Sequence, residues 1–270
     1  MDAKTWVPEG ISQDMPNGAR MYDYFLGGYY NFEIDRQMSE KALQIYPDGR
    51  LTAQACRAFL RRVTGFFVEQ GIDQFLEIGS GIPTSGHVHE VAQKANPAAR
   101  VVYVDIDPVA IAHGQAILKD NLNAIAIVGD VRRPDDILGH PEVKGLLDFG
   151  RPVAVSLLTL LHAVVDDEQA YAAVRVLRDA LVPGSYIAIS HGTRENAPPE
   201  TIKQMEMLTR GTSMPARYRS HADIEPFFEG LEVVEPGLVH IPLWRPEGPD
   251  DVLLDEPERV LIYGGVGRKP

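Results

Sequence analysis

The sequence has little cysteine and no long uninterrupted apolar run. Cys56 is the only cysteine among 270 residues, so an intrachain disulfide cannot form, and we expect a cytoplasmic protein. The first residues lack the basic start and apolar stretch of a signal peptide. The longest apolar segment, 152–165, is interrupted by polar residues and is shorter than the roughly 18 residues that a membrane helix needs. We therefore expect no membrane partner.

Positive charge is also scarce. Lys and Arg number 26 against 38 Asp and Glu, which gives a net charge of −12. Such an acidic protein repels a phosphate backbone unless it carries a concentrated basic patch. The densest basic groups are Arg57 with Arg61 and Arg62, and the pair Arg132 and Arg133. The first group has helical spacing and is interpreted as a solvated helix face, so a nucleic-acid partner is disfavoured.

Apolar residues are plentiful enough for one sizeable core, at 44% of the chain. From residue 74 onward, short apolar strands alternate with amphipathic helices. Strands are predicted at 75–78, 101–104, 124–128, 153–158 and 186–189, and helices at 87–95, 108–119 and 168–181. This alternation predicts an α/β fold with a doubly wound, mostly parallel sheet. The strand-like segments 231–234 and 260–263 are expected to pair at one sheet edge.

The N-terminal part has a different pattern. Residues 1–20 are polar and contain Pro and Gly, which predicts an irregular arm, whereas 34–70 carries two helical apolar stripes. We expect 1–73 to form an N-terminal arm and a helical cap or lid, and 74–270 to form the ligand-binding core. Within the lid, Gly27-Gly28 is a candidate hinge.

The strongest motif is a glycine-rich turn, Gly79-Ser80-Gly81, directly after the first predicted strand. Glycines allow the backbone to approach a ligand closely, and the following helix offers free N–H donors. A dinucleotide fold would have a third glycine where Thr84 stands. Glu77, two residues before the turn, would repel pyrophosphate. It suits a ligand that carries an ammonium and a sulfonium, which are the charges of S-adenosylmethionine.

Acidic residues also end the next two predicted strands. Asp105 is placed to accept both ribose hydroxyls of that cofactor, with Ile106 against the adenine face. Asp130, beside Val131, is placed to accept from the adenine amino group. One G-x-G turn is weak support, but Glu77, the two glycines and these carboxylates in order at strand ends form a specific pattern.

On these motifs the sequence resembles the class I S-adenosylmethionine-dependent methyltransferases. It also resembles a bacterial family of candidate methyltransferases long catalogued as a domain of unknown function. The second resemblance covers nearly the whole chain and rests on segments 19–28, 31–32, 35–36, 74–84, 89–90, 101–105, 244–246 and 265–268. It implies the fold and the cofactor and names no substrate.

Methyl transfer is an in-line displacement, so alignment supplies much of the rate and a base is needed only for a poorly ionised acceptor. The segment after the fourth predicted strand lacks the Asn/Asp-Pro-Pro-aromatic turn of nucleobase N-methyltransferases. We expect a small-molecule acceptor, with His162 and His191 as candidate catalytic bases. Arg20 is expected to pair with the methionine carboxylate.

A metal is not expected. Asp166 and Asp167 lie near the proposed acceptor site, but they are expected to open the helix at 168–181. Two alternatives remain open at this point: a non-catalytic regulatory protein that binds S-adenosylmethionine or S-adenosylhomocysteine, and, less favoured, a dinucleotide-dependent oxidoreductase. The oligomeric state is also left open.

Overall fold

The computed structural model describes residues 15–83, 86–210, 212, 215–249 and 251–270. Its α-helices are α1 (Gly18–Phe25), α2 (Glu33–Ile45), α3 (Gly49–Glu69), α4 (Val88–Ala95), α5 (Pro108–Leu118), α6 (Pro134–Gly139), α7 (Pro141–Leu146), α8 (Asp167–Asp179), α9 (Pro199–Thr209) and α10 (His221–Ile224). Its strands are β1 (Gln74–Ile78), β2 (Arg100–Asp105), β3 (Ala124–Val128), β4 (Ala154–Leu158), β5 (Tyr186–Gly192), β6 (Glu232–Val233), β7 (Val239–His240) and β8 (Ile262–Arg268). Short 3₁₀ turns include η1 (Leu161–Ala163), η2 (Glu225–Phe228) and η3 (Ile241–Leu243).

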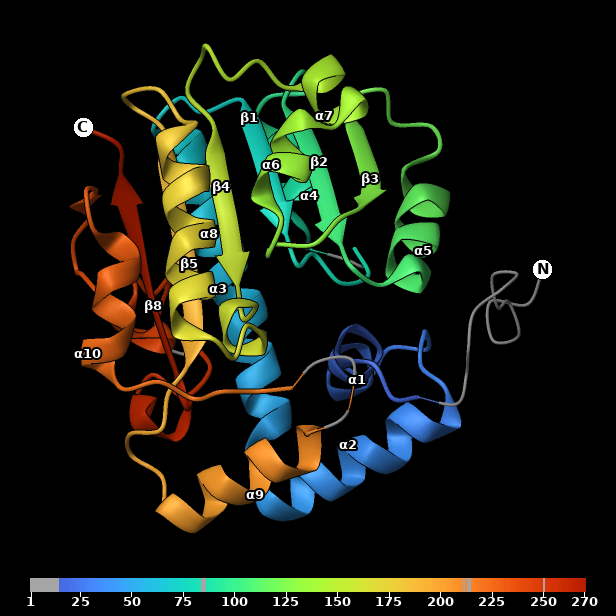
Figure 1. The fold of residues 1–270 in the computed structure, drawn as a ribbon, viewed down its shortest axis with the longest axis vertical. Coiled ribbons are helices and arrows are strands. Elements are labelled where there is room, and N and C mark those ends of the chain that lie inside the picture. The colour runs from blue at the N-terminus through green and yellow to red at the C-terminus, as the bar shows by residue number, and fades with distance from the viewer. Residues whose placement is uncertain (1–14, 84–85, 211, 213–214, 250) are drawn as a thin grey trace.

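One mixed sheet organises the molecule, with the strand order β3-β2-β1-β4-β5-β8-β6 (Figure 1). Strands β1 to β5 are parallel, and β8 runs antiparallel between β5 and β6, with β7 also paired to β8. The predicted doubly wound, mostly parallel sheet is therefore confirmed. The two C-terminal segments do lie at one side of it, but 232–233 pairs with 267–268, and 262–263 pairs with β5 rather than with 231–234. The order reverses between β1 and β4, and ligands of open α/β sheets bind at such a switch point.

Both faces of the sheet are covered. Side chains of α3, α4 and α5 pack on one face, and those of α6, α7, α8 and η2 pack on the other. Successive residues of a strand point to opposite faces, so Phe75 enters the first cluster and Leu76 the second. The same alternation places Glu77 on the face that α3 covers.

Helix α3 is held against the sheet by aromatic packing. Phe59 and Phe66 both meet Trp244 edge-on, with ring centroids 5.6 and 5.8 Å apart. Burying such rings contributes several kcal/mol each, so α3 is part of the main core rather than a separate cap. The expectation of a solvated basic face on this helix is wrong for two of its arginines. Arg57 is buried, and the buried Arg62 donates to the carbonyls of Trp244 and Ile241.

Helices α1, α2 and α9 lie beyond the carboxyl ends of the parallel strands (Figure 1). Helix α2 packs on α1 and on α9. The prediction of an irregular arm at 1–20 is wrong for residues 18–20, which begin α1 after the N-cap Asn17. The first 14 residues of the expected arm lie outside the described part of the chain. Thr84 lies outside it as well. Within the described ranges, no helix is long and apolar enough to cross a membrane.

Candidate active site

A cavity of about 350 Å³ opens at the carboxyl ends of β1 to β4 and extends to α1, α2, α3 and α9. Its size is within the usual range of small-molecule sites. The predicted site residues that line it are Glu77, Gly79, Ser80, Gly81, Asp105, Ile106, Asp130, Val131 and His162. Arg20 and His191 are not among its lining residues.

The glycine turn needs its glycines for two different reasons. Gly79 has φ +76°, and a Cβ on it would lie 2.7 Å from Leu160 Cδ1. Gly81 has φ +60°, and its N–H donates to Asp105 Oδ2 over 2.8 Å. Left-handed backbone and close approach both favour glycine. The turn after β1 is thereby tied to the end of β2.

Asp105 combines a buried position with unused hydrogen-bonding capacity. Its Oδ1 accepts from the Asp107 N–H over 2.9 Å, while Oδ2 accepts from Gly81. Each carboxylate oxygen has a second lone pair, which can accept a further hydrogen bond. Burial raises the pKa of Asp105 to about 6, because desolvation disfavours the ionised form more than the two N–H donors favour it.

Two other predicted contacts lie at neighbouring strand ends. Asp130 follows β3, and both of its carboxylate oxygens accept from Arg132, which holds the pKa of Asp130 below its usual value. Ile106 follows β2 and leaves 44% of its surface exposed, so an apolar face is available to a ligand. Val131 is buried beside them.

Two polar side chains, Glu77 and His87, are buried at the β1 end of the cavity. Glu77 Oε2 and His87 Nδ1 lie 3.8 Å apart, and neither has a hydrogen-bond partner among the described residues. Burial lowers the pKa of His87, and its Nε2 donates to the Ile82 carbonyl over 3.1 Å. Nδ1 is then an acceptor that faces a second acceptor. Glu77 Oε2 therefore has no donor among the described residues.

Arg57 is a buried cation that lines the same cavity as this carboxylate. It extends from α3, on the sheet face to which Glu77 belongs, and the charges of both residues act on the His87 imidazole. Only 8% of Arg57 is exposed, and within the described structure its Nε and Nη1 have no hydrogen-bond partner. Sequence reasoning missed it because its helical spacing with Arg61 indicated a solvated face.

Arg20 does not occupy the position predicted for it. It is buried outside the cavity lining, where Nε donates to Asp35 Oδ2 over 2.8 Å and Nη2 donates to the Met15 carbonyl. The same Asp35 accepts from the Asn17 N–H and stabilises the start of α1. Arg20 therefore does not line the cavity in which the methionine carboxylate is expected. Its charge is already used to join α1 to α2.

His162 lies in the cavity wall, on the turn η1 that follows β4. Ring contacts hold it: the imidazole is nearly parallel to Tyr218 (8°) and edge-on to His191. Its Nδ1 is buried without a hydrogen-bond partner in the described part of the chain. Burial, together with the positive charge of Arg219, lowers the pKa of His162 to about 4, so the ring is neutral at pH 7.

His191 is fully buried behind this wall, so its prediction as a base in the crevice is wrong. Its Nδ1 donates to the Gly192 carbonyl over 2.8 Å, and its Nε2 lies 2.7 Å from Arg219 Nη1, from which it accepts. Both ring nitrogens are occupied by the protein. Burial lowers the pKa of His191 well below its usual value, so the ring stays neutral.

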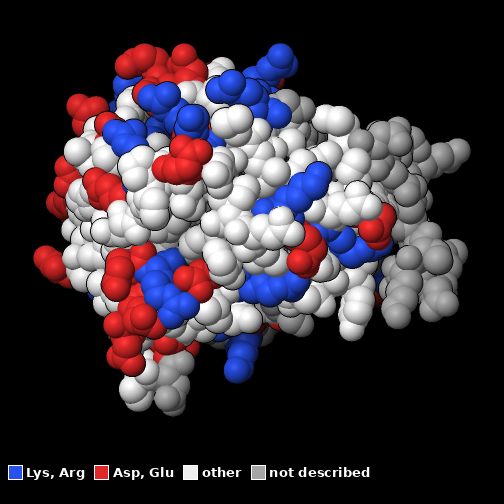
Figure 2. Space-filling view, turned by 90° about the horizontal axis from the view of Figure 1, so that it is seen from below, with Lys and Arg blue, Asp and Glu red and all other residues white. Residues whose placement is uncertain are grey.

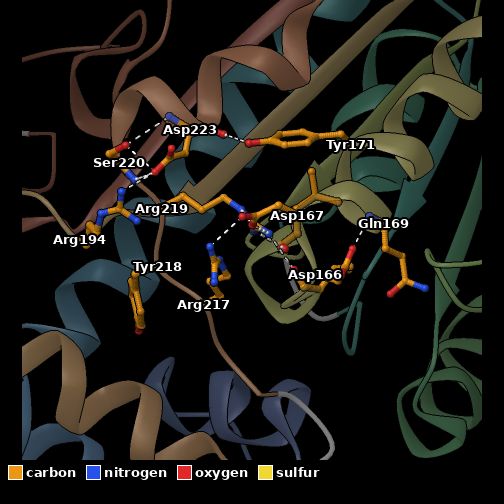
Figure 3. Close-up of polar contacts among 12 residues, drawn as sticks. Asp166, Asp167, Gln169, Tyr171, Arg194, Arg217, Tyr218, Arg219, Ser220 and Asp223 are labelled. Carbon is orange, nitrogen blue, oxygen red and sulfur yellow. Dashed lines mark hydrogen bonds and ion pairs between the residues drawn. The ribbon is translucent and has the colours of Figure 1, made fainter.

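Arg219 holds the loop that carries His162 through hydrogen bonds to its backbone. Its guanidinium is 1% exposed and donates to the carbonyls of Leu161 and Val164, which bracket η1. It also donates to Asp167 Oδ1 through Nε and Nη2, at 3.0 and 2.8 Å (Figure 3). Two donors on one carboxylate oxygen hold it in place and pair the two charges. No sequence motif marks Arg219.

Asp166 and Asp167, which follow η1, form the start of α8. Asp166 caps this helix by accepting from the Gln169 N–H, and Asp167 begins it, as predicted (Figure 3). Among the residues that the structure describes, no group of three or more His, Cys, Asp or Glu side chains is placed to hold a metal ion.

Comparison with known proteins identifies the family. The family described as S-adenosyl methyltransferase matches residues 4–270. The chain therefore belongs to the S-adenosyl methyltransferase family, and the fold and cofactor implied by the sequence resemblance are confirmed. It is an S-adenosylmethionine-dependent methyltransferase by family rather than a dinucleotide-dependent oxidoreductase.

Two solved structures are similar over almost their full length. A candidate methyltransferase from Thermobifida fusca YX is 40% identical with a TM-score of 0.91, covering 98% of this chain and 99% of its own. A DUF574 family protein from Streptomyces avermitilis MA-4680 is 37% identical with a TM-score of 0.88, covering 95% and 98%. A comparison with curated proteins found no match.

The raised pKa of Asp105 predicts a pH dependence of cofactor binding. The carboxylate must be ionised to accept from two ribose hydroxyls, so affinity should be constant well above pH 6 and fall as pH drops below it. Titration calorimetry with S-adenosylhomocysteine should show about a tenfold loss per pH unit there. Asp105→Asn should bind more weakly at pH 8 and lose this dependence. Retention of the full pH dependence in Asp105→Asn would assign it to another group.

Proposed function

We propose that this enzyme methylates a small-molecule acceptor inside the cavity, with the cofactor bound along the ends of β1, β2 and β3. Asp105 accepts the ribose hydroxyls, and Ile106 and Val131 contact the adenine. Asp130 accepts from the adenine amino group. The observation that carries this proposal is the buried Asp105 carboxylate, which keeps free lone pairs where it faces the cavity.

The methionine end of the cofactor is proposed to lie between Glu77 and Arg57, beside Gly79, Ser80 and Gly81. An amino-acid group is a zwitterion, so its ammonium supplies the donor that Glu77 Oε2 lacks. Its carboxylate supplies the acceptor that Arg57 Nε and Nη1 lack. Buried polar groups without partners cost roughly 1–3 kcal/mol each, so a ligand that satisfies them binds more tightly. Arg57 thus takes the role first expected of Arg20.

When bound, S-adenosylmethionine supplies an activated methyl group on a sulfonium sulfur. The protein's own contribution is to orient the acceptor, exclude water and receive a proton. We propose His162 as the proton acceptor, because it is a neutral imidazole that lines the cavity, whereas the other lining imidazole, His87, lies beside Glu77 and donates to the Ile82 carbonyl. Arg219 holds η1 and so positions His162, while His191 supports the ring from behind.

The surface charge and the single cysteine are compatible with a small-molecule acceptor and a cytoplasmic location. On the face below the sheet, basic and acidic side chains are interspersed rather than gathered into one basic surface (Figure 2). The protein has a net charge of −12, so it attracts a negatively charged nucleic-acid substrate poorly. Cys56 is buried and free, as expected of a reducing compartment.

We also propose that the segment before α3 covers the bound cofactor, while α3 and residues 74–270 form the core that binds it. Ala19 of α1 lies over the glycine turn, with its Cβ 3.8 Å from where a Gly81 Cβ would be. Gly28 does not act as a hinge, because it packs against the Asp23 carboxylate, which also accepts from Tyr30 and Asn31. The cover is α1 and its following turn, moving as one unit.

The role of Arg57 predicts a ligand-specific loss of affinity. Arg57→Met should weaken S-adenosylhomocysteine binding by about 10- to 100-fold, because charge-assisted hydrogen bonds to the carboxylate are worth roughly 1.5–3 kcal/mol. Binding of 5′-methylthioadenosine, which lacks the amino-acid group, should be unchanged. Titration calorimetry with both ligands checks this, and Arg61→Met, an exposed position outside the cavity, is the control. An equal loss for both ligands would contradict the assignment.

The cover predicts where ligand protects the backbone. Amide hydrogen exchange over 18–28 should slow when S-adenosylhomocysteine is added, together with exchange at 79–81, because the cover and the glycine turn enclose the same ligand. Slower exchange at 79–81 with no change over 18–28 would rule out a cover.

A further inference from the structure

The cavity has two chemically different ends. The charged side chains that line it, such as Arg57, Glu77, Asp105 and Asp130, come from the strand ends, the loops after them and α3. The other end, here called the acceptor end, is lined by α1, α2, α9 and residues 215–218. Its larger side chains include Met21, Phe25, Met38, Leu43, Met205 and Leu208. Within the part of the chain that the structure describes, no charged side chain from these elements lines the cavity.

The polar atoms of the acceptor end are mostly occupied by the protein. The Tyr46 hydroxyl bonds to Thr52 and to the Arg259 carbonyl. The Thr209 hydroxyl donates to carbonyls of its own helix and accepts from the Ala216 N–H over 3.0 Å. A polar ligand placed here would lose water and gain few hydrogen bonds in return.

His162 is the exception, and it lies where the two ends meet. It follows β4, whose carboxyl end faces the cofactor turn, and its ring stacks with Tyr218 of the acceptor end. Its Nδ1 has no hydrogen-bond partner among the described residues, whereas both ring nitrogens of His191 are occupied. The acceptor end therefore presents one neutral imidazole in a wall whose other described side chains are uncharged.

We propose that the methyl acceptor is an uncharged molecule with an apolar skeleton and one hydroxyl group, held between α2 and α9 with the hydroxyl toward His162. A carboxylate there would have no cation to pair with, and an alkylammonium no carboxylate, so both would be desolvated without compensation. This inference rests on the proposed function, because it takes the charged end as the cofactor's place.

The reaction then balances without a further reactant. A lone pair of the acceptor oxygen forms the bond to the methyl carbon, and the carbon–sulfur bond breaks with its electron pair going to sulfur. The hydroxyl proton passes to an imidazole nitrogen of His162, which releases it to water. The products are the methyl ether, S-adenosylhomocysteine and a proton.

Three naphthalene derivatives of similar shape test whether the acceptor end disfavours charged ligands. Titration calorimetry on enzyme saturated with S-adenosylhomocysteine should detect binding of 2-naphthol. It should show binding weaker by about tenfold or more for 2-naphthoate and for 2-naphthylmethylamine, because the charged groups stay desolvated. Tighter binding of either charged probe, or no binding of 2-naphthol, would overturn the inference. If S-adenosylhomocysteine itself fails to bind, it is the proposed function that fails.

Two substitutions on α9 locate the site. Leu208 lines the cavity, whereas its neighbour Met207 is 59% exposed and is not among the lining residues. Leu208→Arg should abolish 2-naphthol binding while S-adenosylhomocysteine still binds, which also shows that the variant is folded. Met207→Arg should change neither. If 2-naphthol binds Leu208→Arg normally, the acceptor does not lie against α9.

If Leu208→Arg does not fold, Met38→Gln in α2 should give the same selective loss of 2-naphthol binding, and unchanged 2-naphthol binding by Met38→Gln would overturn the inference.

Discussion

A buried guanidinium with no anionic partner in the described structure is the constraint around which this site is arranged. Arg57 belongs to a helix whose apolar face is fixed to the sheet through Phe59, Phe66 and Trp244. Burying a charge without a partner is costly, and a helix less firmly held would turn it toward water. The aromatic core thus maintains a binding group that is poorly satisfied until a ligand arrives, as is common at functional sites.

The cavity has a charged end and an uncharged end. Strand ends supply fixed charges and backbone donors, because parallel strands bring their carboxyl ends to one edge of the sheet. Helices α1, α2 and α9 supply an apolar wall with little charge. A sulfonium cofactor needs the first environment, and an uncharged acceptor needs the second. Thr159, in left-handed backbone with φ +50° at the end of β4, lines the cavity where the two environments meet.

The sequence predicted well what depends on local pattern. Alternating apolar strands and helices gave the sheet, and glycines or acidic residues placed directly after strands were found at the cavity, from Gly79 to Asp130. It predicted poorly what depends on which charges meet in three dimensions. Arg20 and Arg57 are both arginines on N-terminal helices, and only the fold shows that Asp35 neutralises the first. Likewise, nothing local distinguishes the cavity-lining His162 from the enclosed His191, whose partner Arg219 is 28 residues away. The helix α9, which forms much of the acceptor end, was not predicted at all.

A crystal structure of the enzyme with S-adenosylhomocysteine tests the central claim most directly. The account predicts ribose hydroxyls on Asp105, the amino-acid carboxylate on Arg57 and its ammonium beside Glu77. The sulfur should face His162 and the apolar space between α2 and α9. Adenine bound in that apolar space, or the carboxylate bound away from Arg57, would contradict it.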